Sequence, residues 1–200
     1  MQQEVLDQVE RERIVEMASN LANIVSITGD EENVAKYLGS EFEKLGMKVE
    51  YQYVEDGRPN VIGTLKGTGG GATLMFNAHM DHFDAPQETV VDEDRIYGRG
   101  LVNMKAAFPC YIEAVSALQK AGAKLKGDLI ISGVVGEIEK AQIGRFHGKE
   151  YRGAGVGARY LMDHGVMADM CIIGEPTGLQ LQIGNSGLLW ARVSVDGKAT

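Results

Sequence analysis

Hydrophobic residues recur at helical spacing near the start of the chain and gather into short unbroken runs further on. The helical spacing predicts an amphipathic helix over about 9–25 and a second helix over about 34–45, ended by Gly46. The triplet Thr-Gly-Asp at 28–30 separates the two helices and is expected to cap the second one. The chain therefore opens with two helices before its first strand.

Strand-like segments and two further helices alternate over the rest of the chain. Short apolar runs bounded by Gly-rich and Asp-rich turns predict strands, and apolar positions at helical spacing predict helices. The strands are expected at 48–54, 60–66, 73–78, 128–135 and 168–173, and the helices at about 105–121 and 155–164. Because strands of buried character alternate with helices, the sequence predicts an α/β fold, a mixed, largely parallel sheet with helices on both faces.

The pattern changes after residue 187. Residues 188–195 alternate apolar and polar positions, as a half-exposed strand does, and then run into the turn-like segment 196–200. We expect residues 1–186 to form the N-terminal part of one domain. Residues 187–200 are expected to be the first strand of a second domain that continues beyond these 200 residues.

Composition and charge limit the classes of protein that fit. The 200 residues are 44% hydrophobic and 24% charged, which is enough for one sizeable core. No apolar run is long enough to span a membrane, and the acidic N-terminal segment does not resemble a signal peptide. The net charge of −8 argues against a nucleic-acid partner. Cys110 and Cys171 stand in apolar contexts, so we expect reduced thiols in the core of a cytoplasmic protein.

Three of the apolar runs end in residues that bind metals. One run ends at His79 and Asp81, another is followed by Glu137 and Glu139, and a third by Glu175. Imidazole nitrogen and carboxylate oxygen are the ligands expected for zinc or a neighbouring first-row metal. A single histidine at a strand end is more often an ordinary buried or surface residue. Three such ends in one sheet favour a metal site, because active sites collect at the carboxyl ends of strands.

The spacing of His79 and Asp81 also suits a metal ligand and the residue that orients it. The imidazole binds a metal through one ring nitrogen, while the carboxylate accepts a hydrogen bond from the other nitrogen and fixes the tautomer. A fourth cluster is the Gly-rich loop 97–105, Tyr-Gly-Arg-Gly-Leu-Val-Asn-Met-Lys, which leads into a predicted helix. Taken alone, this loop also fits an ordinary turn in which Arg99 forms a salt bridge.

The order of these four clusters resembles the co-catalytic zinc metallopeptidase family that includes acetylornithine deacetylase, succinyl-diaminopimelate desuccinylase, aminoacylase and glutamate carboxypeptidase. His79 and Asp81 resemble the family's His-x-Asp pair, and residues 97–105 resemble its Gly-Arg-Gly-x-x-Asp-Met-Lys loop. The segment 174–177, Gly-Glu-Pro-Thr, is similar to the family's strand-end carboxylate. The resemblance covers nearly the whole chain and implies a zinc-exopeptidase-like catalytic domain, with 195–200 at the start of a lid domain.

The resemblance implies a role for each matching residue. His79 would bind one metal and Asp81 would orient it. Glu137 falls on the general base that activates the water bound to the metal. Glu175 would bind the metal opposite His79, and Asn103 stands where the family has an Asp that bridges two metals.

Two departures from the family's pattern leave alternatives open. A neutral amide at Asn103 offers one oxygen ligand but cannot share a negative charge between two cations, so a single-metal or differently bridged site competes with a binuclear one. The family has two adjacent glutamates, whereas Ile138 separates Glu137 from Glu139 here. A one-residue bulge at the strand end would allow Glu139 to act as the ligand. The candidate metal ligands are His79, Asn103, Glu139 and Glu175.

The resemblance implies a metal-dependent hydrolase that cleaves an amide in an N-acylated amino acid or a small peptide-like substrate. The cofactor would be one or two zinc ions, with cobalt or manganese as other choices, and the lid would allow a homodimer. The 200 residues alone are expected to have little activity, since the family's last metal ligand lies beyond them.

The main alternative is a non-catalytic or metal-depleted relative that serves as a binding or assembly module, which Asn103 and the separated glutamates favour. A nucleotide site at 67–71 is disfavoured, because that loop precedes a strand and lacks the helix N-terminus that holds phosphate.

Overall fold

The computed structural model describes residues 2–83, 87–138, 153–184 and 197. Its helices are α1 Gln2–Leu6, α2 Arg11–Asn23, α3 Glu32–Lys44, α4 Ala107–Lys120 and α5 Val156–Asp163, with a short π-type turn, η1, at Leu101–Lys105. Its strands are β1 Lys48–Glu55, β2 Arg58–Leu65, β3 Leu74–His79, β4 Val90–Val91, β5 Ile96–Tyr97, β6 Leu129–Val134 and β7 Met170–Ile173. No helix within these described ranges is long and apolar enough to cross a membrane.

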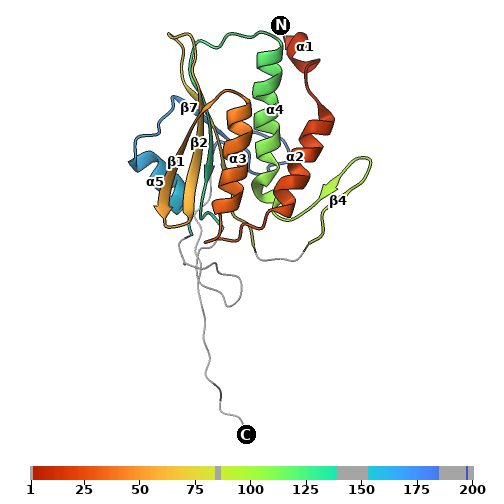
Figure 1. The fold of residues 1–200 in the computed structure, drawn as a ribbon, viewed down its shortest axis with the longest axis vertical. Helices are drawn as coiled ribbons and strands as arrows, with labels where there is room; N and C mark the ends of the chain where they lie inside the picture. Colours follow the sequence, from red (N-terminus) through yellow and green to blue (C-terminus); the bar gives the residue numbers. More distant parts are fainter. Residues whose placement is uncertain (1, 84–86, 139–152, 185–196, 198–200) are drawn as a thin grey trace.

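Five strands form one mixed sheet in the order β1-β2-β6-β3-β7. The pairs β6/β3 and β3/β7 are parallel, and the pairs β1/β2 and β2/β6 are antiparallel. Helices α2, α3 and α4 lie on one side of this sheet, and α5 lies on the other side (Figure 1). The α/β fold with helices on both faces, predicted from the sequence, is therefore confirmed.

The central strand β6 shows why its sequence is an unbroken apolar run. Leu129 and Ile131 belong to the large core beneath α2, α3 and α4, whereas Ile130 and Val134 pack on the other face against Leu161 of α5. All six residues of β6 are buried, because the strand has a neighbour on each side and helices on both faces. This rigid centre carries the strand ends at which the candidate residues lie.

The region before the first strand differs from the prediction in two respects. The helix predicted over about 9–25 is α2, Arg11–Asn23, and the short α1, Gln2–Leu6, precedes it without having been predicted. The predicted cap at 28–30 is wrong, because the residue that precedes α3 is Glu31, whose side chain makes no capping hydrogen bond. The Thr28 hydroxyl instead donates a 2.7 Å hydrogen bond to the buried Asp81 carboxylate. An ionised carboxylate is a stronger acceptor partner than a neutral group, which explains where this hydroxyl points.

The prediction that both cysteines lie in the core is also wrong. Cys110 and Cys171 are free thiols on exposed residues. Cys110 is on α4, at a position turned away from the buried side of the helix. Cys171 is on the edge strand β7, whose four residues are all exposed in the described part of the chain. An apolar context predicts a helix or a strand, but burial also needs an element that covers the residue's own side of it.

Candidate metal centre

Three parallel strand ends converge at one edge of the sheet. His79 is the last residue of β3, Glu137 follows β6, and Glu175 follows β7. The register pairs Asn77 with Ile173, and two further residues along both strands place Glu175 beside His79. One ligand atom from each of His79, Glu137 and Glu175 lies within 4.8 Å of the other two. The structure thus brings together three of the residues singled out in the sequence.

The Nε2 atom of His79 lies at the centre of this group. It is 2.5 Å from Asn103 Oδ1, 3.5 Å from Glu175 Oε1 and 3.8 Å from Glu137 Oε2. The imidazole is buried, while the side chains of Glu137 and Glu175 are 36% and 39% exposed. Three oxygen donors and one imidazole nitrogen therefore face a single point that is open to solvent on one side.

Asp81 is fully buried and supports this arrangement through its hydrogen bonds. Its carboxylate accepts hydrogen bonds from the Thr28 hydroxyl at 2.7 Å and from the backbone amides of Glu137 and Ile138 at 3.0 and 2.9 Å. The Nδ1 atom of His79 lies 3.0 Å from the Asp81 carbonyl oxygen and 3.4 Å from its Oδ1. With Nδ1 engaged in this way, Nε2 is the ring nitrogen left for a metal.

The charges around His79 set its protonation. Burial alone lowers the pKa of His79, but hydrogen bonds to Asp81 and Glu175 and the charge of Glu137 outweigh it and raise the pKa to about 10. Burial raises the pKa of Asp81, yet the hydrogen bonds and charge of His79 and the Thr28 bond hold it below its usual value. In the metal-free protein a proton therefore occupies His79 at neutral pH, and a cation competes with that proton for the same electron pair.

We expect metal affinity to rise with pH by about tenfold per unit between pH 6 and 9, because each bound ion displaces one proton from His79. The sign follows from the raised pKa of His79, which keeps the ring protonated in the metal-free state throughout this range. Competition with a chromophoric chelator at several pH values measures the effect. An affinity that does not change with pH would contradict the assignment of His79 as a ligand.

Asn103 is presented by the turn η1. Gly100, with φ of +69°, precedes this turn, and a Cβ at Gly100 would lie only 2.9 Å from the His82 Cβ. Lys105 at the end of the turn is fully buried and donates hydrogen bonds of 2.9 and 2.7 Å to the carbonyls of Leu21 and Ile24 at the end of α2. Burial, reinforced by the charge of Arg99, lowers the pKa of Lys105 to about 7. The turn that carries Asn103 is thus tied to α2.

Tyr111 of α4 fixes the segment that carries Glu175. Its hydroxyl donates a 3.1 Å hydrogen bond to the carbonyl of Asn77 in β3, and its ring stacks on Phe76. A Cβ at Gly174 would lie 2.5 Å from the Tyr111 hydroxyl oxygen, so only glycine fits there without displacing the ring. This close approach allows the chain to pass over α4 and turn Glu175 towards His79.

The other candidate groups are placed as follows. His82 turns away from the centre: its Nε2 accepts a 2.9 Å hydrogen bond from the Ser26 amide, and burial lowers its pKa to about 4. His82 is therefore neutral and structural. Arg99 and Asn103 line a cavity of about 280 Å³ that adjoins the centre. Glu139 and the predicted strand at 188–195 lie outside the described residues.

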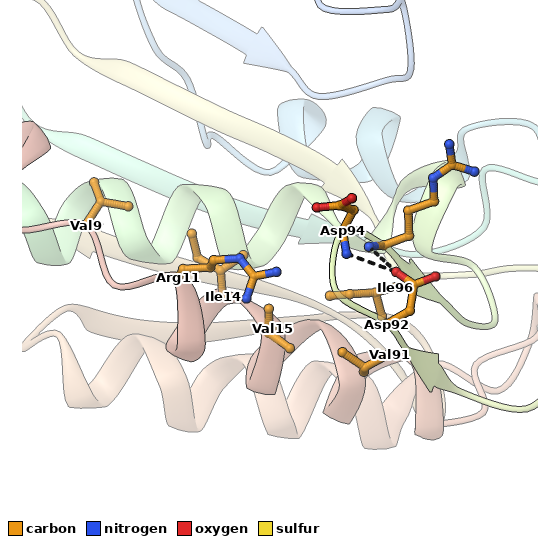
Figure 2. Close-up of a pocket in the computed structure, with 9 residues that line it drawn as sticks. Val9, Arg11, Ile14, Val15, Val91, Asp92, Asp94 and Ile96 are labelled. Carbon is orange, nitrogen blue, oxygen red and sulfur yellow. Dashed lines mark hydrogen bonds between the residues drawn. The ribbon is translucent and has the colours of Figure 1, made fainter.

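A separate hollow of about 290 Å³ lies between the start of α2 and the β4–β5 hairpin (Figure 2). Arg11 closes one side by donating a 2.6 Å hydrogen bond to the Glu93 carbonyl. The carboxylate of Asp92 accepts hydrogen bonds from the backbone amides of Asp94 and Arg95, and these bonds shape the hairpin turn. None of the residues that line this hollow is a candidate ligand, so it is not part of the centre.

The sequence indicates the groups that face the centre and the supporting residue Asp81, but not the other residues that hold them in place. Thr28, Glu31 and Tyr111 all reach the site through contacts between segments far apart in the chain. No local motif marks such residues. Lys105 was visible only as a member of the Gly-rich loop, without its link to α2.

The fold and the site define a class of protein: an α/β sheet whose adjacent parallel strands end in a cluster of imidazole and carboxylate groups. Residues 75–196, more than half of the chain, match the family described as Peptidase family M20/M25/M40. The chain therefore belongs to this family.

Named relatives agree with this assignment. The chain is 25% identical to the N-formyl-4-amino-5-aminomethyl-2-methylpyrimidine deformylase of Bacillus subtilis, over 84% of this chain and 39% of that protein. It is 26% identical to a probable succinyl-diaminopimelate desuccinylase of Staphylococcus aureus, over 95% of this chain and 45% of that protein. The chain thus spans less than half the length of these relatives.

A solved structure shows the same fold. The crystal structure of a tripeptidase from Staphylococcus aureus matches with a TM-score of 0.67 and 20% identity, over 84% of this chain and 44% of that one.

Proposed function

We propose that the full-length protein is a metal-dependent hydrolase that cleaves an amide bond in a small N-acylated amino acid or peptide-like substrate. The observation that carries the proposal is the position of Glu137, whose carboxylate lies 3.8 Å from His79 Nε2 at the same point as Glu175. Membership of the peptidase family supports it. The names of the relatives, a deformylase, a desuccinylase and a tripeptidase, denote removal of an acyl group or cleavage of a peptide.

The donor set fits a divalent first-row metal. We assign His79, Glu175 and the amide oxygen of Asn103 as its ligands, because they face one point and the other ring nitrogen of His79 is already engaged. Nitrogen and oxygen donors in this combination suit zinc, and also cobalt or manganese. Glu139 remains a proposed further ligand.

Glu137 is proposed as the general base. The chemistry that a bound cation supplies is Lewis acidity, which acidifies water and polarises a carbonyl. Glu137 takes one proton from the attacking water while the water oxygen bonds to the carbonyl carbon, and it later delivers that proton to the leaving nitrogen as the C–N bond breaks. The backbone of Glu137 is held by Asp81, and its half-exposed carboxylate remains accessible to substrate.

The test combines metal content and turnover in the full-length protein. We expect elemental analysis to find at least about one divalent ion per chain, in keeping with a four-donor site. Turnover is expected on a panel of formyl, acetyl and succinyl amino acids and of dipeptides and tripeptides, with added zinc, cobalt or manganese. Bound metal without turnover on any member of the panel would favour the non-catalytic binding module. Asn103 in place of the bridging Asp, and Ile138 between the two glutamates, are the features that favour this alternative. Absence of both would exclude the metal centre as well.

A further inference from the structure

A buried ion pair lies beside the candidate metal centre. The guanidinium of Arg58, the first residue of β2, donates hydrogen bonds of 2.9 and 2.8 Å to the two carboxylate oxygens of Glu31. A third bond of 2.9 Å joins Arg58 to Glu55. The side chains of Arg58 and Glu31 are only 1% and 0% exposed. Burying such a pair costs desolvation that its attraction does not always repay, so stability alone is a weak reason for its presence.

The topology places this pair at the same sheet edge as the centre. Strand β2 runs antiparallel to β6, with Val61 opposite Gly133. Extending this register three residues back from Val61 and three residues forward from Gly133 leads to Arg58 and to Gly136, the residue that precedes Glu137. The pair therefore flanks the end of β6 on the side away from β3, whereas Asp81 follows β3 on the other side.

The two sides meet at the backbone that carries Glu137. The Gly136 amide donates a 3.2 Å hydrogen bond to Glu31 Oε1. The next two amides, of Glu137 and Ile138, donate to Asp81 at 3.0 and 2.9 Å. Two buried carboxylates, which lie on opposite sides of β6, thus accept hydrogen bonds from three consecutive backbone amides. The direction of the Glu137 side chain depends on both.

Arg58 compensates the buried negative charge of Glu31. Burial raises the pKa of Glu31 and the nearby charge of Asp81 adds to that, while the two hydrogen bonds from Arg58 oppose it. The bidentate contact also fixes the plane of the Glu31 carboxylate, so that Oε1 faces the Gly136 amide.

We propose that Glu31 and Arg58 are positioning residues for Glu137: their ion pair fixes the Gly136 amide and thereby aims the Glu137 carboxylate at the metal centre. The catalytic meaning of this placement rests on the proposed function. The placement itself concerns backbone hydrogen bonds and is measurable without turnover.

The test uses paired variants of the full-length, metal-loaded protein. Replacing Arg58 alone would leave a buried charge on Glu31 and lower stability directly, so both charges are removed together. Glu31→Leu with Arg58→Met leaves the Gly136 amide without an acceptor, whereas Glu31→Gln with Arg58→Met keeps an amide oxygen there. We expect kcat to fall about 10²-fold in the first double variant with little change in KM. In the second, kcat is expected to recover in part, because the amide oxygen of Gln needs no counter-charge but lacks the orienting bonds of Arg58.

Two controls separate positioning from general damage. Glu55→Gln removes the third partner of Arg58 but has no link to Gly136, and is expected to leave kcat unchanged. Metal content is expected to stay the same in all variants, because no candidate ligand is altered. Equal kcat in the two double variants would mean that the pair acts on stability only, and would overturn the proposal.

Hydrogen exchange of the amides at 136–138 gives the second readout. In the Leu/Met variant the Gly136 amide should exchange roughly tenfold faster, as the loss of its hydrogen bond implies, and in the Gln/Met variant it should stay protected. Unchanged exchange in the Leu/Met variant overturns the positioning role, whether or not the protein is active. Faster exchange in a protein with no turnover on any substrate overturns the proposed function and upholds the placement of Glu137.

Discussion

We expect replacement of Glu137 by Gln to lower kcat of the full-length protein by about 10²- to 10⁴-fold, while its metal content stays unchanged. Glutamine has the shape of glutamate but cannot take up the proton of the attacking water. The backbone amide of residue 137 still donates to Asp81, so the strand end keeps its position. Steady-state kinetics on any substrate found in the panel, together with elemental analysis, measure the two quantities.

The matched control is Glu32→Gln, which removes an exposed carboxylate that pairs with Lys36 on α3. We expect it to leave both kcat and metal content unaltered. If the Glu137→Gln variant turned over substrate as fast as the parent protein, the base would be another group and the mechanism proposed above would be wrong.

We expect replacement of Asp81 by Asn to lower metal affinity by about 10- to 100-fold and to destabilise the fold as well. The carboxylate accepts three hydrogen bonds from Thr28, Glu137 and Ile138 and also contacts His79 Nδ1. An amide has one acceptor oxygen, and its NH₂ group would face one of these donors. Leaving one buried donor unsatisfied costs about 1–3 kcal/mol of unfolding free energy. Metal titration and chemical denaturation report the two effects.

The pH dependence of stability supplies a further check on Asp81. Its pKa is lowered in the folded state, so the ionised form contributes stability above the ordinary carboxyl pKa, and this contribution is lost as pH falls through the lowered value. The Asp81→Asn variant lacks that acid-induced loss. Asp92→Asn is the matched control, since the Asp92 carboxylate also accepts hydrogen bonds from two backbone amides but lies on the exposed hairpin, outside the candidate metal centre. An equal fall in metal affinity in both variants would refute a specific role for Asp81.

The residues that face the centre were predictable because they follow strands that the sequence marks clearly. Each of β3, β6 and β7 is a short apolar run, and His79, Glu137 and Glu175 stand at or just beyond the ends of these runs. Parallel neighbours in one sheet bring such ends together without any further information. The same local pattern gave α3 and α4 to within a few residues.

The supporting residues were not predictable, because each depends on a partner that only the tertiary fold provides. Thr28 is an ordinary helix-capping residue in sequence, yet its hydroxyl goes to Asp81 across the fold. The sequence around Arg58 is typical of a surface arginine in a turn. Only the pairing of β2 with β6 buries its side chain against Glu31. The strands of the β4–β5 hairpin are two residues each, too short for a periodic signal.

The spacing of the sheet has a consequence for how such a site diversifies. Neighbouring strands lie about 4.8 Å apart in any sheet, and His79, Glu137 and Glu175 stand at or just beyond the ends of three parallel strands. The spacing of the main chain at these three positions is therefore set by strand pairing, while the direction of each side chain still depends on supporting residues such as Asp81. A substitution at one strand end changes the chemical nature of one donor and leaves the scaffold of the others in place. Metal preference is then open to stepwise change on an unaltered framework, one donor at a time.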